Sequence, residues 1–416
     1  MSASDKTQYA ELSQNLEHSG GVYPKTSDEK KINKKRLMYI WFAILLIFLA
    51  ATVLLLENGT IRGKPKEPCQ RRIVGYLDLI HDELEFTEKQ IANLTHLIIT
   101  PMEVDSDGSL SFRHYGEKDR FETIVSMARK FPDLKVIVSL ADVIGNPAQV
   151  IRNFEAKAVL LNKTADFLAR EDIDGIDINW KWPRTDEDYE YLTSFCEDLR
   201  EKLTQMASST DRKTHFSISA LLPAHIPSTK VSKLMECLDF VTITTHNYYG
   251  SWQTNLPYLL GPASPLYSKL GKLPNENVDS SMKEYSCFTK QPNKLNILVE
   301  FMGRYWKHLE MPLNGEVRSD WIEWRKMANS EWDIKHASWN NDSKTPYIWN
   351  SYEKKYMAFE NERSLEEKIK YAIEMNIGGL AVWRIDHDDS ENTLLNVVSS
   401  AELCSGSYNT AVKYDC

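Results

Sequence analysis

Three polar residues near the end of one short segment, DGIDINWKWP at 174–183, have the types and spacing to do chemistry. Successive side chains of an extended strand point to opposite faces, so Asp177, Asn179 and Lys181 share one face. A carboxylate, an amide and an ammonium group in one row can transfer protons, bind a polar ligand or hydrogen-bond to one another. The apolar residues between them predict a buried strand that delivers the polar face to a site.

The segments on either side predict the frame that holds this row. From residue 71 onward, apolar segments of strand character alternate with amphipathic helical segments. The expected strands are 72–80, 94–102, 134–142, 174–180, 215–223, 238–246, 294–302 and 378–386. Eight such units in one run predict an α/β fold, a (β/α)8 TIM barrel, whose sites lie at the C-terminal ends of the strands. The polar row falls at such an end.

Residues of about 305–359 do not fit the alternation. They are rich in tryptophan and polar residues, so we expect a small α/β insertion subdomain between strand seven and the following helix. Capping boxes are expected where two helices begin, one joining Thr87 and Gln90 and one joining Ser364 and Glu367.

One segment departs from the globular pattern. LMYIWFAILLIFLAATVLLL, residues 37–56, carries no charge, and its length as a helix is about 30 Å, the thickness of a hydrocarbon core. A buried core helix or a secretory signal is the alternative, although signal cores are shorter and nearer the N-terminus. The basic run KKINKKR at 30–36 places the N-terminus in the cytoplasm, which predicts a single-pass type II membrane protein.

The cysteines and glycosylation sequons agree with that orientation. All six cysteines follow the apolar segment, which fits disulfides in an oxidising lumen or the cell exterior, although sequence alone does not choose their pairing. The Asn-x-Ser/Thr sites at Asn58, Asn93, Asn162 and Asn341 also follow the apolar segment. The expected organisation is a cytoplasmic tail at 1–36, a transmembrane signal-anchor helix at 37–56, a stem at 57–70, the barrel at 71–404 and a C-terminal tail at 405–416.

Composition and charge exclude other classes of function. A net charge of −9 shows no global basic bias, so no nucleic-acid partner is expected. No second histidine or cysteine stands at ligand spacing from His246, so we expect no metal and no cofactor. Nothing in the sequence identifies a protein partner.

The polar segment also carries a resemblance. DGIDINWKWP resembles the DGxDxDxE signature of glycoside hydrolase family 18, the chitinases and chitinase-like proteins. Further segments similar to that family are VTITTHNYYGSW, SPLY at 264–267, KLNILVEFMGRYW and the block from TPYIWN to IDHDD. The resemblance covers about residues 71–400 and implies a TIM barrel with an insertion after strand seven.

The resemblance also implies that the catalytic residues have changed. In the family, the signature glutamate protonates the leaving oxygen and the substrate's own acetamido group attacks the anomeric carbon. Lys181 stands at the glutamate position and Asn179 at that of the adjacent aspartate, whereas Asp174 and Asp177 keep the family identity. On strand six, His246 and Asn247 replace a Tyr-Asp pair, and on strand seven Met302 replaces a tyrosine.

Lysine at the acid position argues against hydrolysis. A general acid works best with a pKa near the operating pH, and a lysine side chain has a reference pKa of about 10.4. An ammonium group also stands where positive charge must develop on the sugar. We therefore expect a pseudoenzyme in which Asn179 hydrogen-bonds to both Asp177 and Lys181, forming a neutral polar ladder. The alternative is that Lys181 contacts a ligand.

Sugar binding can survive the loss of catalysis. Trp383 matches the tryptophan that forms the floor of the family's central sugar subsite, and aromatic faces suit a pyranose. Further candidates for sugar binding are Trp252, Trp306, Trp182 and Tyr248. The expected ligands are chitin or N-acetylglucosamine oligomers.

Two other functions stay open. One is a structural or signalling scaffold whose groove binds no sugar. The other is a weak or altered glycosidase, which needs a new pair of carboxylates, and the nearest candidates are Asp386, Asp388 and Glu300.

Overall fold

The computed structural model describes residues 34–46, 70–80, 86–141, 147–210, 212–226, 228–250, 260–268, 273–307, 309, 318–400, 402–404 and 410–416. The chain divides into two units, residues 1–67 and 68–416. In the first unit, residues 34–46 are helical and include the start of the apolar segment, whose residues 47–56 lie outside the described ranges. Within those ranges, no helix is both long and apolar enough to span a membrane.

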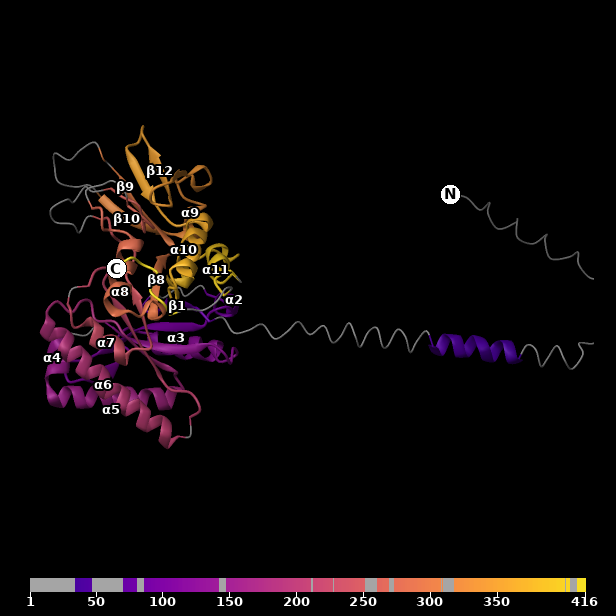
Figure 1. Cartoon of the computed structure of the whole chain (residues 1–416), viewed down its shortest axis with the longest axis horizontal. Helices are drawn as coiled ribbons and strands as arrows, with labels where there is room; N and C mark the ends of the chain where they lie inside the picture. Colours follow the sequence, from indigo (N-terminus) through magenta and orange to yellow (C-terminus); the bar gives the residue numbers. More distant parts are fainter. Residues whose placement is uncertain are drawn as a thin grey trace, which may run out of the picture. The chain divides into compact units, whose positions relative to one another are not determined.

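The second unit is built on eight parallel strands that close into a barrel (Figure 1). The strands are β1 (Arg72–Asp78), β2 (His96–Val104), β4 (Lys135–Ala141), β5 (Gly175–Ile178), β6 (Ser217–Leu222), β7 (Phe240–Ile243), β8 (Leu295–Glu300) and β14 (Gly379–Trp383). Each pairs with the next along the chain, and β1 closes the ring by pairing with both β2 and β14. All eight expected strands are therefore present.

Helices surround this ring. They are α2 (Glu88–Ile91), α3 (Glu117–Ala128), α4 (Pro147–Arg152), α5 (Phe154–Glu171), α6 (Asp186–Ser209), α7 (Val231–Cys237), α8 (Val278–Thr289), α10 (Glu362–Glu374) and α11 (Thr393–Val398). A two-residue strand, β3 (Leu110–Ser111), adds an antiparallel edge to β2. Within the part of the chain described, the fold is the expected TIM barrel.

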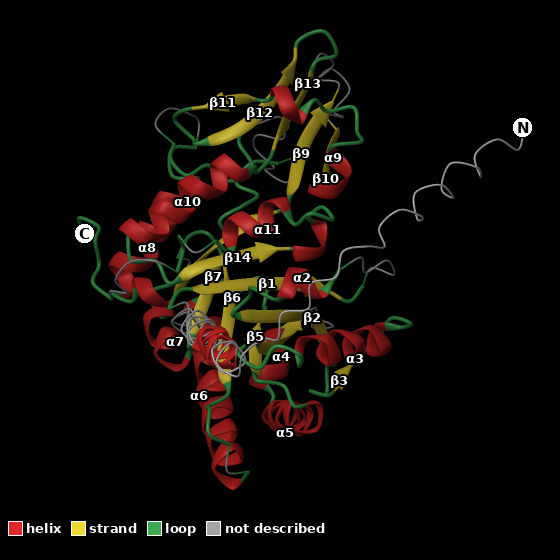
Figure 2. Ribbon diagram, turned by 90° about the vertical axis from the view of Figure 1, so that its right-hand side faces the viewer, coloured by secondary structure: helices red, strands yellow, loops and turns green. Residues whose placement is uncertain are grey.

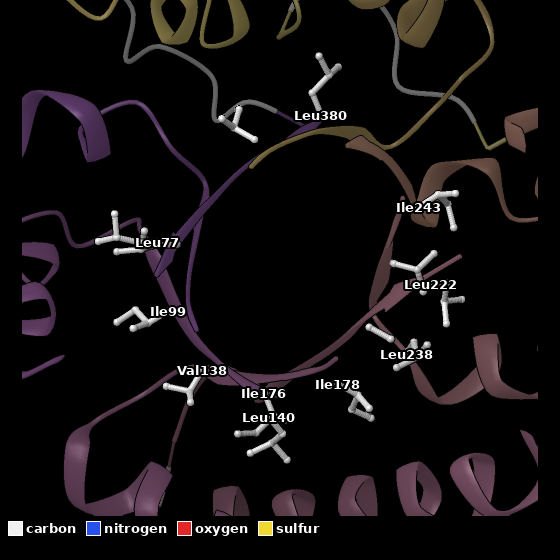
Figure 3. Packing of buried hydrophobic residues seen from close by; sticks show 14 of the residues in the cluster. Leu77, Ile99, Val138, Leu140, Ile176, Ile178, Leu222, Leu238, Ile243 and Leu380 are labelled. Carbon is white, nitrogen blue, oxygen red and sulfur yellow. The ribbon is translucent and has the colours of Figure 1, made fainter. Parts of the chain in front are cut away.

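Alternation along the strands separates two apolar cores. Side chains such as Leu77, Ile99 and Ile176 point outward from the ring and pack between strands and helices (Figure 3). A smaller inner core fills the barrel, and its members are Val74, Tyr76, Ile98, Ile137, Leu221, Phe240, Leu298 and Ala381. Ile176, Ile178 and Trp180 all belong to the outer core, which confirms that Asp177 faces the barrel interior.

A second, antiparallel sheet interrupts the barrel between β8 and α10, and it lies at the upper end of the unit in Figure 2. Its strands, in spatial order, are β10 (Arg318–Glu323), β9 (Met302–Lys307), β13 (Lys355–Ala358), β12 (Thr345–Asn350) and β11 (Ser338–Asn340). The short helix α9 (Trp324–Met327) follows β10. This sheet begins at Met302, only one residue after β8, so the insertion grows directly from the barrel rim.

One predicted helix start is confirmed and the other is wrong. The Thr87 N–H donates to Oε1 of Gln90 at 2.7 Å, as the first capping box requires. Helix α10 begins a turn earlier than expected, because Asn361 is its N-cap. The Asn361 N–H donates to Ser364 Oγ at 2.9 Å, and the Ser364 N–H donates to Asn361 Oδ1 at 3.0 Å. Ser364 therefore lies inside the helix and is not the N-cap of a capping box with Glu367.

Disulfides join distant parts of the second unit. Cys196 of α6 is bonded to Cys237 of α7, and Cys287 of α8 is bonded to Cys416. Cys404 is also disulfide-bonded. The pairing that sequence left open is thus given for two pairs, and Cys196 and Cys237 are not free thiols.

Candidate functional site

A cavity of about 530 Å³ opens at the C-terminal ends of the barrel strands. Its described lining residues are Lys181, Trp182, Leu221, Pro223, Ala224, Thr244, His246, Asn247, Tyr248, Glu276, Leu298 and Trp383. Five different strands or the loops after them contribute, as in other barrels of this type. The cavity therefore lies where the sequence placed the site.

Asp177 lies beneath this cavity with no exposed surface. Strand register puts it level with Ser139 on β4 and Ser219 on β6. Both serine hydroxyls donate to its carboxylate, at 2.9 and 2.7 Å. Burial raises the pKa of Asp177 to about 6, although these hydrogen bonds and the Lys181 charge lower it.

The expected ladder through Asn179 is wrong. Asn179 is buried, but its Oδ1 has no hydrogen-bond partner among the described residues, and the Asp177 oxygens accept hydrogen bonds from two serines. Residues two positions apart on one strand lie about 6.6 Å apart, whereas the serines on neighbouring strands are in direct reach. Cross-strand partners therefore satisfy Asp177 in place of its neighbours along the chain.

Lys181 lies in the cavity itself. Its side chain is exposed, and its Nζ lies 5.4 Å from the ring centroid of Trp383. This places a cation over the aromatic ring at the barrel mouth. Lys181, which stands at the acid position of the family resemblance, and Trp383, the candidate for sugar stacking, are thus brought together.

His246 and Asn247 flank the same cavity. Loss of solvent, together with the charges of Arg304 and Lys181, lowers the pKa of His246 to about 3, so the imidazole is neutral at physiological pH. Asn247 has a left-handed backbone (φ 58°), and its Oδ1 accepts a hydrogen bond of 3.1 Å from Arg304 Nη2. Neither side chain carries a charge that can replace a catalytic carboxylate.

Two of the three candidate carboxylates are engaged elsewhere. Arg384 donates to both Asp386 oxygens, at 3.1 and 2.7 Å. Asp388 accepts backbone N–H groups at the start of α11. Glu300 is buried and is not among the described lining residues. Among the described lining residues only Glu276 is a carboxylate, and it is paired with His225 at 3.3 Å.

The aromatic candidates divide into two groups. Trp383, Trp182 and Tyr248 line the cavity, and the Tyr248 hydroxyl is hydrogen-bonded to Ser281 Oγ at 2.8 Å. Trp306 is fully buried in the second sheet, with its ring centroid 5.7 Å from that of Tyr356, and is not among the described lining residues of the cavity. Trp252 lies outside the described residues.

Asp174 belongs to the opposite end of β5. It accepts hydrogen bonds from Arg129 Nη1 at 2.8 Å, Arg212 Nη2 at 2.6 Å and the Val136 N–H at 2.9 Å. Burial raises the pKa of Asp174, but these hydrogen bonds outweigh it and bring the pKa below its ordinary value. The residue ties strands and helices at the barrel bottom and is remote from the chemistry.

The predicted glycosylation sites that the structure describes lie on the surface. Asn93, Asn162 and Asn341 are exposed, and Asn58 lies outside the described residues. In the described ranges, no group of three or more His, Cys, Asp or Glu side chains could hold a metal ion.

Residues 72–388 match the profile of the family described as glycosyl hydrolases family 18. The chain belongs to this family. Chitinase A1 of Niallia circulans is 24% identical over 305 residues, which are 66% of this chain and 43% of that protein. Human chitinase-3-like protein 2 is 22% identical over 316 residues, 71% of this chain and 80% of that protein.

Solved structures share the fold of this family 18 chain. A family 18 N-acetylglucosaminidase from Paenibacillus barengoltzii superposes with a TM-score of 0.68 at 20% identity, covering 79% of this chain and 99% of the other. Human YKL-39, a pseudo-chitinase with retained chitooligosaccharide binding properties, gives 0.69 at 19% identity, covering 80% and 100%. At this identity the likeness establishes the fold alone.

Proposed function

We propose that this chain is a catalytically inactive chitinase-like membrane protein whose barrel binds chitin-type or N-acetylglucosamine-containing glycans. The observation that carries the proposal is the pairing at the barrel mouth of Lys181, at the family's acid position, with Trp383, at its sugar-stacking position. The acid is lost and the aromatic floor is kept.

Inactivity follows from the charges around the cavity. A lysine is a poor acid for the first step, because with a reference pKa of about 10.4 its ammonium group keeps the proton at neutral pH, and while it does so it has no lone pair with which to act as the base in the second step. Glu276, the carboxylate in the described lining, is paired with His225. Asp177 lies beneath the cavity and is hydrogen-bonded to two serines.

Binding rests on the aromatic lining. Trp383, Trp182 and Tyr248 offer apolar faces, and His246 and Asn247 offer hydrogen-bonding groups. Cavities of this size and mixed character suit small organic ligands. Human YKL-39, which shares the fold, is a pseudo-chitinase that retains chitooligosaccharide binding, so the two properties occur together in another protein.

The membrane anchor is proposed from the sequence. Residues 37–56 carry no charge and follow the basic run at 30–36, so the barrel is on the lumenal or extracellular side. The cysteines and the exposed sequons after this segment support that side.

A scaffold without sugar binding is the second candidate, because the Lys181 ammonium covers Trp383. A neutral sugar must displace that ammonium before it can stack on the indole. This costs the cation–π contact, about 0.5–1 kcal/mol at an exposed site.

Titration calorimetry of the full chain in detergent micelles with N-acetylglucosamine oligomers tests the proposal. We expect weak binding, roughly micromolar to millimolar, because a few stacking contacts must offset the cost of association. Trp383→Ala should weaken it by about tenfold or more. The matched control is Trp349→Ala, which removes an exposed tryptophan of β12 that does not line the cavity.

The outcomes separate the candidates. No heat with any oligomer would end the sugar-binding proposal and leave the scaffold. Unchanged binding by Trp383→Ala would place the sugar site elsewhere on the chain.

A further inference from the structure

The Lys181 ammonium has hydrogen-bonding capacity that the described protein does not use. The side chain lines the cavity and is exposed, with its Nζ over the Trp383 ring at 5.4 Å. It forms no ion pair and no hydrogen bond with the described residues. Its three N–H donors are therefore open to a ligand that reaches the floor of the cavity.

Asp177, the nearest negative charge beneath Lys181, does not take up these donors. Its two oxygens each accept a hydrogen bond from a serine on a neighbouring strand. It is fully buried, whereas Lys181 is exposed to the cavity. A ligand entering from solvent therefore meets the ammonium group and not the carboxylate.

Arg304 lies next to the same part of the cavity wall, because its Nη2 donates to Oδ1 of the lining residue Asn247 at 3.1 Å. The charges of Arg304 and Lys181 both lower the pKa of His246, a residue of the cavity wall. His246 itself is neutral, and Asn247 carries no charge. The wall and floor beside Trp383 thus present the Lys181 ammonium and two neutral polar groups, His246 and Asn247.

Glu276, the carboxylate in the described lining, is paired with a histidine. Its carboxylate lies 3.3 Å from His225 Nε2, and Glu284 approaches the other ring nitrogen at 3.1 Å. Hydrogen bonds to these two glutamates raise the pKa of His225 to about 9, so the histidine is a cation at neutral pH. One histidine cation is shared by two glutamates, so His225 offsets the charge of Glu276 only in part.

We propose that the cavity selects an acidic oligosaccharide, with a carboxylate or sulfate group on or next to the N-acetylhexosamine that stacks on Trp383. The inference rests on the proposed sugar binding and adds its ligand class. A neutral sugar displaces the ammonium from the indole and offers it no charge in return. An acidic group forms a charge-assisted hydrogen bond with the displaced ammonium.

Calorimetry of the full chain with four matched tetrasaccharides tests this. The probes are neutral tetra-N-acetylchitotetraose, its 6-O-sulfated form, a hyaluronan tetrasaccharide, which supplies carboxylates, and the fully deacetylated tetramer, which supplies amines. We expect at least one acidic probe to bind about tenfold more tightly than the neutral one, or about 1.4 kcal/mol. The advantage should shrink between about 0.02 M and about 0.5 M sodium chloride, because salt screens an exposed charge pair.

Three variants assign the effect. Lys181→Met should bind acidic and neutral probes equally, and Lys181→Arg should retain the preference. The control Lys233→Met removes one exposed lysine of α7, outside the cavity, and should change neither affinity. The salt dependence of the unmodified chain gives an answer that requires no variant.

Each result decides the matter. If sulfate or carboxylate alone is preferred, that probe identifies the acidic group. Equal binding of neutral and acidic probes, a preference that survives Lys181→Met, or tightest binding of the amine probe would overturn the inference. If the neutral probe binds through Trp383 without an acid preference, the proposed function stands and the inference falls. If no probe binds, both fall.

Discussion

Glu300 lies directly opposite Trp383 in the parallel pairing of β8 with β14, so a buried acid stands beside the aromatic floor of the cavity. Its side chain is 1% exposed, and neither carboxyl oxygen has a hydrogen-bond partner among the described residues. The pKa of Glu300 is raised to about 8, mainly by burial. The charge of Arg304 lowers it, that of Glu360 raises it, and that of Lys368 lowers it. The group is mainly protonated and uncharged at neutral pH.

Glu300→Gln should remove part of the pH dependence of stability. Because the folded pKa lies above the ordinary value of 4.5, the native state holds the proton more tightly than the unfolded chain. The stabilisation is complete below about pH 4.5 and is lost as the pH rises through about 8. Relative to the variant, the wild type should lose on the order of 3 kcal/mol between pH 5 and pH 9.

Thermal melts followed by tryptophan fluorescence measure this difference. The two proteins should melt at similar temperatures near pH 5 and diverge progressively up to about pH 8, with the variant higher. Melting curves that stay parallel across this range would show that Glu300 is not a buried acid in solution.

Lys368→Met should destabilise the barrel strongly. Lys368 Nζ donates to both Glu360 oxygens, at 2.8 and 3.1 Å, and neither side chain is exposed. Removing one partner leaves a buried carboxylate without its counter-charge, which costs about 3–5 kcal/mol. Adding Glu360→Gln should recover much of the loss, since no unpaired charge then remains.

Urea unfolding gives the free energies for this cycle. The control is Lys118→Met, which breaks an exposed pair with Glu122 at 3.5 Å and should cost less than about 1 kcal/mol. Equal losses from Lys368→Met and Lys118→Met would contradict the assignment of a buried pair.

The full chain should not hydrolyse chito-oligosaccharides above a buffer control, and Lys181→Glu alone should not restore hydrolysis. A new acid at residue 181 still lacks the groups that orient the acetamide, because Asn179, His246 and Asn247 are unchanged. Chromatography of the products over long incubation measures this. Turnover by the unmodified chain at a chitinase-like rate would refute the pseudoenzyme proposal.

Protease added to sealed microsomes should spare the chain after residue 57 and remove the N-terminal tail. Endoglycosidase should increase gel mobility, and Asn→Gln changes at Asn93, Asn162 and Asn341 together should abolish most of that shift, because these three sites are exposed on the barrel. A digested barrel with an intact tail would show the reverse orientation.

The strands could be predicted from sequence because burial follows local periodicity. Ile176, Asp177 and Ile178 show the alternation, and the structure places them outside, inside and outside the barrel. The partners of Asp177 could not be predicted, because Ser139 and Ser219 meet it only through the register of three strands. The signal in the sequence was a serine at an inward-facing position of each neighbouring strand, which can donate a hydrogen bond to a buried carboxylate.

Aromatic residues show the same limit. Trp383 and Trp306 are both strand tryptophans near the barrel rim, but Trp383 lines the cavity and Trp306 is fully buried. Their difference is set by the insertion sheet, whose strand β9 carries Trp306 beside Tyr356 of β13. Such pairing joins segments about fifty residues apart, which local patterns do not encode.

The bond between Cys287 and Cys416 has a consequence for the chain after cleavage. The loop it closes contains the last two barrel strands and the whole second sheet. A protease that cuts once within this loop produces two fragments, and the Cys287–Cys416 bond keeps them covalently joined to each other. Such a nicked molecule runs as one species on a gel until reductant is added, so its apparent integrity depends on the redox state of its surroundings.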